Sequence, residues 1–159
     1  KHSKKMNKQL GQVKQFHELF SHPVLDYPQI PSNERCQLRV SLLKEEVEEF
    51  EKAISDKDIV EIADSLSDIA YVLYGAILEF GLGNKFNDLF NEVQRSNMSK
   101  ACSSHKETVD TIAFYESKNI ESYYKEVDGK FLIFRKSDNK VLKSINYSPA
   151  NLKNILNNE

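Results

Sequence analysis

The stretch from Glu45 to Asp64, EEVEEFEKAISDKDIVEIAD, decides the fold of this chain. It holds one acidic cluster at 45–49, a second at 61–64 and, between them, Ser55-Asp56-Lys57-Asp58, which is typical of a helix break. Apolar residues recur at helical spacing on both sides of that break. The stretch therefore predicts two helices that fold back on each other.

Such a hairpin brings the two acidic clusters to the same height. With a fold-back about residue 55, Glu49 lies level with Glu61, Glu46 lies level with Asp64, and Asp68 lies about one turn deeper. Carboxylates that close repel one another, and some stay protonated unless a cation neutralises them. A hard divalent ion with oxygen ligands is the simplest neutralising group, so the spacing predicts a metal site.

The rest of the chain adds helices and then a small β appendage. The helices, hairpin included, are expected at about 8–20, 33–54, 58–80, 84–98 and 107–117. Strands flank the Asp128-Gly129 turn, a third strand is expected at 140–145, and Ser148-Pro149 predicts the start of a last helix. We expect an all-α helical bundle at 7–118 and a C-terminal β-hairpin or meander with a short helix at 119–159.

Composition and charge restrict the class of protein. The chain has 159 residues, 40% hydrophobic and 29% charged, which is enough for one domain with a core. A net charge of −2 argues against a nucleic-acid partner. No apolar run is long enough to cross a bilayer, and no apolar segment follows the basic start at 1–5 to make a secretory signal. We expect a cytoplasmic protein with no membrane partner and two free thiols, Cys36 and Cys102.

Each acidic residue also has an ordinary structural interpretation. The glutamates at 45–51 could form a solvated helix face. Glu61 could be the capping-box partner of Asp58, and Asp64 could pair with a lysine. These interpretations do not explain why the acids match in height. They also do not explain why Asp64 and Asp68 lie in an apolar part of their helix, where an ionised group is costly unless it is paired or bound to metal.

The pattern Glu45-Glu46-x-x-Glu49, a gap, and Glu61-x-x-Asp64 resembles the signature of the all-α nucleoside triphosphate pyrophosphohydrolases. That superfamily includes MazG-like proteins, dimeric dUTPases, dCTP pyrophosphatases and phosphoribosyl-ATP pyrophosphohydrolase. Further matching segments are Val13-x-x-Phe16-His17, Arg39-x-x-Leu42, Arg95-Ser96-Asn97-Met98-Ser99-Lys100 and Lys143-Ser144-x-x-Tyr147-Ser148-Pro149-Ala150. The resemblance covers most of the chain and implies a bundle of MazG-like type.

The resemblance implies a magnesium-dependent hydrolase. In that family carboxylates hold Mg²⁺, the ion binds the triphosphate, and water attack yields a nucleoside monophosphate and pyrophosphate. The matching positions imply these ligands: Glu46, Glu49, Glu61 and Asp64, with Asp68 as an additional or outer ligand. Glu45 is the candidate to orient or deprotonate the water, with Glu46 as its catalytic neighbour. The carboxylates exceed what one Mg²⁺ requires, so one ion or more is expected, and Mn²⁺ could substitute.

The resemblance also implies residues that bind substrate. The candidates for phosphate are Arg95, Asn97 and Lys100. Their alternatives are a surface salt bridge for Arg95 and a helix C-cap for the other two. The candidates for the base are Gln12, Phe16, His17 and Tyr71. Taken alone, Phe16 is more readily a core residue and His17 a surface residue, while Tyr71 packs between helices.

The resemblance to the dimeric dUTPase and MazG-like branch favours dUTP or another pyrimidine deoxynucleoside triphosphate, hydrolysed to clean the nucleotide pool. Two alternatives stay open: hydrolysis of phosphoribosyl-ATP in histidine synthesis, and a non-catalytic helical interaction module with a residual metal site. The helix at 58–80 has apolar residues on more than one face, so we expect a homodimer or homotetramer.

Overall fold

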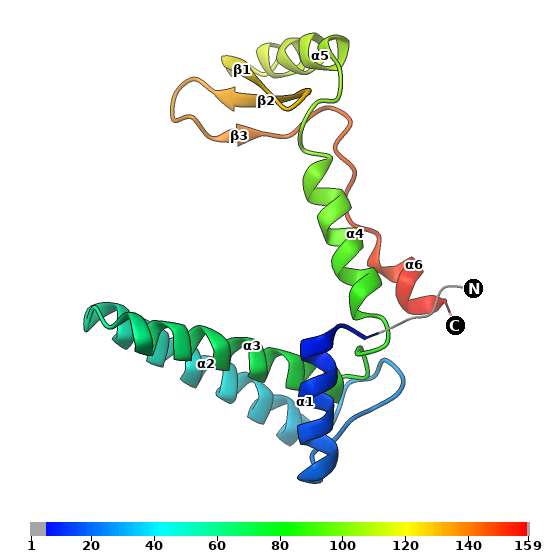
Figure 1. The fold of residues 1–159 in the computed structure, drawn as a ribbon. Coiled ribbons are helices and arrows are strands. Elements are labelled where there is room, and N and C mark those ends of the chain that lie inside the picture. The colour runs from blue at the N-terminus through cyan, green and yellow to red at the C-terminus, as the bar shows by residue number, and fades with distance from the viewer. Residues whose placement is uncertain (1–5, 159) are drawn as a thin grey trace. The chain divides into compact units, whose positions relative to one another are not determined.

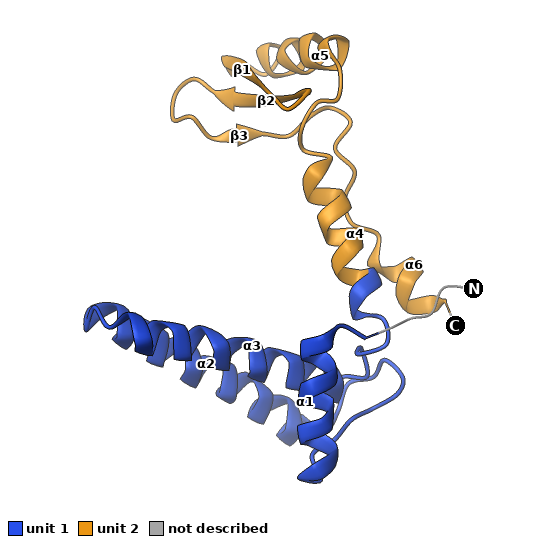
Figure 2. Cartoon of the chain, in the orientation of Figure 1, with its two compact units in different colours: residues 1–88 blue, residues 89–159 orange. Residues whose placement is uncertain are grey.

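Within residues 6–158, which it describes, the computed structural model contains six helices and three strands. The chain divides after Asp88 into two compact units, unit 1 up to residue 88 and unit 2 from residue 89 (Figure 2). The boundary expected between residues 118 and 119 lies inside unit 2. The basic start at 1–5 lies outside the described residues.

Unit 1 is built on a long pair of helices (Figure 1). α2 (Asn33–Ser55) and α3 (Ile59–Glu79) pack along each other, and α1 (Lys8–Leu19) packs on α3. Each helix begins after a capping side chain that accepts hydrogen bonds from first-turn N–H groups; the caps are Asn7, Ser32 and Asp58. The predicted helical hairpin is therefore confirmed.

The turn of this hairpin lies later than predicted. α2 continues through Ser55, and the chain reverses over Asp56-Lys57-Asp58, with Lys57 in the left-handed region at φ 54°. Moving the centre of the turn from residue 55 to residue 57 shifts the pairing of the two helices by about one helical turn. The predicted heights of the acidic residues change accordingly.

The core of unit 1 lies where α1 meets α3. Its buried members are Leu10, Val13, Ile77 and Leu78. The proline-containing segment between α1 and α2 runs beside the end of α3, because Leu25 N donates to Leu78 O and Gln29 N donates to Phe80 O, each at 3.0 Å. The segment between α1 and α2 therefore packs against the C-terminal end of α3.

Unit 2 combines helices with a small antiparallel sheet. α4 (Phe86–Met98) begins just before the unit boundary, and α5 (His105–Glu116) packs on the sheet. The strand order is β1 (Ser122–Val127), β2 (Lys130–Arg135) and β3 (Val141–Leu142). The fold class is confirmed: the chain is mainly helical, with a small C-terminal sheet as its appendage.

The core of unit 2 lies between α5 and the sheet. Cys102, Ile133 and Leu142 are buried there. Cys102 also bridges to Phe131 through two backbone hydrogen bonds of 2.8 and 2.9 Å, so the segment after α4 joins the sheet. Both cysteines are free thiols, as expected.

A buried carboxylate joins the start of α5 to the chain after β3. Glu107, 8% exposed, accepts hydrogen bonds at Oε2 from the N and Oγ of Ser103, both at 2.7 Å. Its Oε1 accepts from Ser144 Oγ at 2.6 Å. Burial raises the pKa of Glu107, but these donors outweigh that effect and hold it below its usual value. We refer to Glu107, Ser103 and Ser144 as the Glu107 latch.

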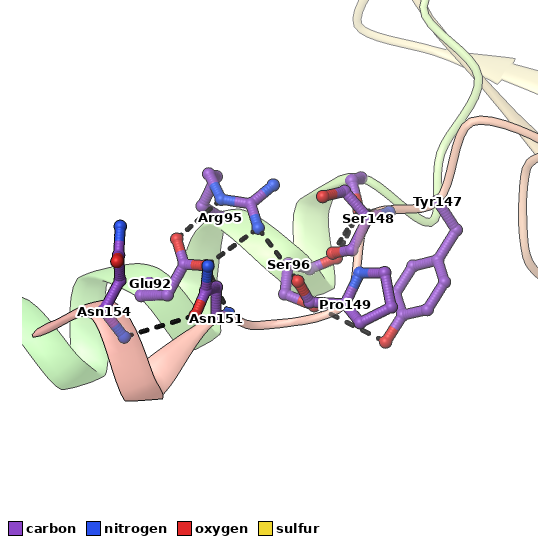
Figure 3. A network of polar contacts seen from close by, with 9 residues as sticks. Glu92, Arg95, Ser96, Tyr147, Ser148, Pro149, Asn151 and Asn154 are labelled. Atoms are coloured by element: carbon purple, nitrogen blue, oxygen red, sulfur yellow. Dashed lines mark hydrogen bonds and ion pairs between the residues drawn. The ribbon is translucent and has the colours of Figure 1, made fainter. Parts of the chain in front are cut away.

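The chain after β3 differs from the prediction. The third strand ends at Leu142 because Ser144 N donates to Lys100 O and Ile145 N donates to Thr111 Oγ1, so neither extends the sheet. The last helix, α6 (Leu152–Asn157), is capped by Asn151 and does not start at Ser148-Pro149. Ser148 N instead donates to Ser99 Oγ of the turn after α4 at 2.9 Å (Figure 3).

None of the helices in the described part of the chain combines the length and the apolar character needed to cross a membrane.

Candidate metal centre

Three carboxylates meet between α2 and α3 in unit 1. Glu46 and Glu49 lie on α2, Asp68 lies on α3, and one carboxylate oxygen from each lies within 4.8 Å of the other two. Residues three apart on a helix share a face, which brings the two glutamates together. We refer to Glu46, Glu49 and Asp68 as the acidic trio.

Burial and mutual repulsion both act on Glu46 and Asp68, whereas Glu49 is exposed. The pKa of Glu46 is raised to about 7, first by burial and then by the charge and hydrogen bond of Glu49 and the charge of Asp68. The pKa of Asp68 is raised by burial and by the charges of Asp64 and Glu49. Glu46 Oε2 is buried and has no hydrogen-bond partner among residues 6–158. These are the properties of carboxylates that lack a compensating positive charge.

Of the other predicted site residues, Asp64 and Glu45 lie beside the acidic trio, whereas Glu61 is placed only near Lys52. Asp64 hydrogen-bonds with Asp68, so it lies beside the trio on α3. Glu45 acts on Glu46 through its charge. Glu61 lies near Lys52, whose pKa is raised mainly by Asp56 and more weakly by the charge of Glu61.

The predicted pairing is therefore wrong by about one helical turn. Glu46 and Glu49 face Asp68, where the prediction placed them level with Asp64 and Glu61. Asp68 is a full member of the closest group and does not lie deeper than the other acids. The cause is the position of the turn, which is centred on Lys57.

The donor set of the acidic trio suits a hard divalent cation. Carboxylate oxygens are the ligands that Mg²⁺ and Mn²⁺ take in proteins, and Mg²⁺ commonly uses few carboxylates together with water and substrate phosphate. The Glu46 oxygen without a partner could act as a ligand without breaking an existing hydrogen bond. Glu46, Glu49 and Asp68 therefore fit such an ion, with Asp64 next to them.

A second polar cluster lies between the same two helices, near the start of α2 and the end of α3. Glu79, 1% exposed, accepts two hydrogen bonds from the Arg35 guanidinium, at 2.6 Å from Nε and 2.8 Å from Nη2. The buried Arg39 lies 3.6 Å from the same carboxylate through Nη1 and donates from Nη2 to Val72 O at 3.5 Å. We refer to Arg35, Arg39 and Glu79 as the arginine cluster.

The arginine cluster sets two guanidinium groups against one carboxylate, so the charge of Glu79 is more than compensated. Burial raises the pKa of Glu79, but the hydrogen bonds of Arg35 and the charges of both arginines outweigh burial and hold it below its ordinary value. This cluster was missed from sequence, because Arg35 and Glu79 are 44 positions apart. The available signals were Glu79 at the end of an apolar helix and Arg39 in a motif that matches the family.

Gly75 and His17 border the arginine cluster. A Cβ at position 75 would clash with Arg39 Nη2 and lie 3.0 Å from His17 Nε2, so a glycine is required for the guanidinium to approach α3. His17 Nδ1 lies 2.9 Å from Pro23 O and must carry the proton, because a carbonyl only accepts. Burial is the main cause that lowers the pKa of His17.

The burial of Phe16 and His17 is the reverse of the expectation. The buried face of α1 runs through Leu10, Val13 and His17, so His17 is 3% exposed, whereas Phe16 lies on the adjacent face and is 39% exposed. The Phe16 ring contacts that of Tyr71 at 5.7 Å between centroids. Two of the four base-binding candidates therefore lie together, while Gln12 is exposed on α1.

The predicted phosphate-binding residues lie in unit 2, and Arg95 is already engaged there (Figure 3). Arg95 makes two bonds to Glu92, at 2.7 and 2.9 Å, and donates to Pro149 O at 3.2 Å. The hydrogen bond from Arg95, followed by one from Asn151 N, lowers the pKa of Glu92 to about 2. Asn97 is exposed and Lys100 half-buried.

The helical hairpin with its acidic trio defines a class of protein, the all-α pyrophosphohydrolases of MazG-like type. The model of the phosphoribosyl-ATP pyrophosphohydrolase family matches residues 13–97, more than half of the chain. The chain belongs to this family, which supports a pyrophosphohydrolase activity in general. The matched range holds every predicted metal ligand and stops before Lys100 and the tail.

A relative that matches most of the chain is an uncharacterized protein of Acanthamoeba polyphaga mimivirus. It is 23% identical over an alignment of 235 residues, which covers 91% of this chain and 94% of that protein. The similarity therefore extends over both units.

Proposed function

We propose that this protein is a divalent-metal-dependent pyrophosphohydrolase that converts a nucleoside triphosphate to the monophosphate and pyrophosphate. The observation that carries the proposal is the acidic trio, whose charge is not compensated by any neighbouring cation in residues 6–158 and whose Glu46 has an oxygen without a partner. The proposed cofactor is Mg²⁺, as one ion or more, with Mn²⁺ as a substitute.

The residues of unit 1 have distinct roles in this proposal. Glu46, Glu49 and Asp68 would hold the ion, and Asp64 and Glu61 would act as further or outer ligands. A bound Mg²⁺ neutralises phosphate charge and lowers the pKa of a bound water. Glu45 would accept a hydrogen bond from the attacking water, orient it and take up its proton.

The substrate proposed first is dUTP or another pyrimidine deoxynucleoside triphosphate. Phe16 and Tyr71 support base binding, since both are partly exposed and their rings lie together, which offers a face on which a base can stack. Gln12 and His17 are the polar candidates on the same helix. Arg95, Asn97 and Lys100 stay the proposed phosphate-binding residues.

A second candidate substrate is phosphoribosyl-ATP, favoured by the family whose model matches. Phosphoribosyl-ATP has the same phosphoanhydride bond to be cleaved as dUTP, and it differs from dUTP in its base and in its additional phosphoribosyl group. The two candidate substrates would present different bases to Phe16 and Tyr71 and the same phosphate chain to a metal ion at the acidic trio.

The test is a pyrophosphate-release assay over all ribonucleoside and deoxynucleoside triphosphates and phosphoribosyl-ATP, with Mg²⁺, Mn²⁺ or EDTA. Metal-dependent release of pyrophosphate with a monophosphate product is expected, fastest with a pyrimidine deoxynucleotide. Release that is fastest with phosphoribosyl-ATP would replace the first substrate by the second. No turnover of any compound would leave a non-catalytic helical module.

We also propose that the protein is a homodimer or homotetramer. The apolar side chains of α3 that stay exposed in unit 1 support this: Ile59, Val60, Leu66 and Leu73. Sedimentation velocity of the full chain should give twice or four times the monomer mass of 18.4 kDa. A monomer at micromolar concentration would contradict the proposal.

A further inference from the structure

The sheet of unit 2 has one long edge that no other strand covers. β2 lies between β1 and β3, and the isolated bridge of Cys102 also joins β2, at Phe131. Within residues 6–158, the side of β1 that faces away from β2 therefore has no strand beside it (Figure 1). An edge strand presents a row of backbone N–H and C=O groups on which another strand can pair.

The backbone hydrogen bonds identify the residues of β1 that face this edge. Lys136 N donates to Glu121 O at 2.9 Å, so the backbone of Glu121 points toward β2. Along an antiparallel strand, successive residues point their backbone groups to opposite sides. The N–H and C=O groups of Ser122, Tyr124 and Glu126 therefore point away from β2. We refer to these three residues as the β1 edge.

The β1 edge lacks the features that commonly protect an edge strand from pairing. Short strands, prolines, bulges and charged side chains serve that purpose in other proteins. β1 is six residues long, contains no proline and pairs with β2 without a bulge. Its one lysine, Lys125, lies over the Phe134 ring on the face of the sheet, with Nζ 5.6 Å from the centroid. Tyr124, at the centre of the edge, is 43% exposed.

We propose that the β1 edge pairs with the β1 edge of a second copy of this chain, antiparallel and about a twofold axis at Tyr124. Tyr124 then lies opposite its own copy, and Ser122 lies opposite Glu126 of the second copy. Three backbone donors from each copy give six hydrogen bonds, and two three-stranded sheets become one sheet of six strands. This interface lies in unit 2, is separate from the apolar side chains of α3, and does not rest on the proposed activity.

Charge selects this register over the neighbouring ones. An axis at Lys125 would place two lysines opposite each other, and an axis at Glu126 would do the same with two glutamates; like charges in opposite positions are destabilising. An axis at Tyr123 would place Glu126 opposite a residue that lies outside the strand, which loses hydrogen bonds. Only the axis at Tyr124 uses the whole edge without opposing like charges.

The side chains that this register brings together are complementary. Lys125 lies opposite Tyr123 of the second copy, and an ammonium group is attracted to an aromatic ring. Glu126 lies opposite Ser122, whose Oγ is buried and has no hydrogen-bond partner within residues 6–158. The carboxylate of the second copy is thus an acceptor for a hydroxyl that lacks one in a single copy.

The helix on the sheet fits the same arrangement. α5 packs on both β1 and β2, so a twofold axis beside β1 places two copies of α5 on one face, about two strand spacings or 10 Å apart. Helices pack at about that distance. His105 of α5 contacts Tyr124 at 6.3 Å between ring centroids, and Val109, one turn further on the same side of α5, is 51% exposed. The second copy of α5 would cover Val109.

The first test compares the full chain with Tyr124→Pro by sedimentation velocity. Because the Tyr124 N–H points away from β2, a proline there keeps the β1–β2 hydrogen bonds and removes the central donor of the edge. The assembly should lose half its mass in Tyr124→Pro and keep its mass in the control Tyr124→Phe. Equal masses for the wild type and Tyr124→Pro would overturn the proposal.

A disulfide test keeps the proposal falsifiable if the proline variant does not fold. Opposite residues of a hydrogen-bonded antiparallel pair have Cα atoms about 5.5 Å apart, which a disulfide can span. Under mild oxidation, Tyr124→Cys should therefore form a covalent dimer. Val127→Cys is the matched control, since it is also exposed on β1 but its two copies would lie about 20 Å apart.

Non-reducing electrophoresis beside the wild type, whose own thiols are Cys36 and Cys102, measures the cross-linking. A covalent dimer in Tyr124→Cys and none in Val127→Cys or the wild type supports the proposal. Equal cross-linking in both variants, or none in either, would overturn it, and pairing of β1 with a different protein predicts the latter result. Failure of the proposed function is distinguishable, because it abolishes pyrophosphate release and leaves the cross-link unchanged.

Discussion

The acidic trio and the arginine cluster lie between the same two helices but differ in charge balance. In the arginine cluster, one buried carboxylate faces two guanidinium groups, and its pKa is held low. In the acidic trio, three carboxylates face one another, and the pKa of Glu46 rises to about 7. Both clusters are polar groups in a helix interface, and each holds a buried atom without a hydrogen-bond partner among residues 6–158, Arg39 Nε in the first and Glu46 Oε2 in the second. They differ because the carboxylate of the first faces cations of the chain, whereas the carboxylates of the second face one another.

We infer from this difference that the arginine cluster supports the fold and that the acidic trio serves the proposed metal-dependent activity. Buried polar groups in folded proteins usually have partners, and exceptions require an explanation. Sequences commonly depart from that rule at functional positions, where local stability is lower than it could be. The arginine cluster should therefore matter most for stability, and the acidic trio for activity.

The largest effect is expected from Glu79→Gln. It leaves Arg39 buried beside a neutral group, and removal of one partner from a buried pair costs about 3–5 kcal/mol of unfolding free energy. Urea titration followed by circular dichroism measures this loss. The control is Asp56→Asn, which breaks the exposed Lys52–Asp56 pair and should cost less than about 1 kcal/mol. Similar losses in both variants would remove the distinction between a buried and an exposed pair.

Glu46→Gln should produce the opposite pattern. Hydrolysis should fall by about 100-fold or more, since even groups that only support a metal ligand cost 10–100-fold when removed. The unfolding free energy in EDTA should stay the same or rise, because repulsion with Glu49 and Asp68 is relieved. Kinetics with Mg²⁺ and urea titration of the same sample test both parts. Glu48→Gln, an exposed neighbour on α2, is the control for activity.

Gly75→Ala should disturb the arginine cluster without changing any charge. The added Cβ meets Arg39 and lies 3.0 Å from His17, and overpacking of this kind costs about 1–3 kcal/mol. The matched control is Gly11→Ala in α1, where a Cβ meets nothing within 4 Å and should stabilise the helix by about 0.5–1 kcal/mol. Thermal unfolding of the two variants should shift in opposite directions. A neutral Gly75→Ala would show that the guanidinium has room to move.

The smallest effect is the pH dependence of stability in EDTA, where the clusters have opposite signs. Glu79 has a lowered pKa, so its contribution is present above the unfolded-state value and is lost as the pH falls through the folded-state value. Glu46 has a raised pKa, so its contribution is complete below the unfolded-state value and is lost as the pH rises through about 7. Urea titrations from pH 4 to 9 should show that the unfolding free energy no longer decreases as the pH rises through about 7 in Glu46→Gln. Persistence of that decrease in the variant would assign it to another group.

The helices could be predicted from local sequence, but which residues of α2 lie opposite which residues of α3 could not. Asp58 fixes the start of α3 through its hydrogen bonds to Val60 N and Glu61 N. Nothing local fixes where α2 ends, since Ser55 and Asp56 are both compatible with a last turn. An error of two residues in the centre of the turn moved the pairing by about one helical turn, which is why Asp68 replaced Asp64 as the partner of Glu46.

Tertiary contacts account for the other differences. His17 is buried because Pro23 O accepts from its Nδ1, a partner that periodicity does not reveal. Ser148-Pro149 satisfies the local rule for a helix start. Ser148 N nevertheless donates to Ser99 Oγ, and the Pro149 carbonyl accepts from Arg95. In both cases a polar group forms a hydrogen bond with a residue that the local sequence pattern does not identify.

The Glu107 latch limits how this protein can be shortened. A fragment that stops at Leu142 would keep every strand of the sheet and all of α5, and of the described helices it would lose only α6. It would nevertheless lose Ser144, whose Oγ donates to Glu107 Oε1, and Asn146, whose hydrogen bond also holds down the pKa of that carboxylate. A buried charge deprived of a donor is costly, so the irregular residues after β3 are a structural part of unit 2 and not a dispensable extension.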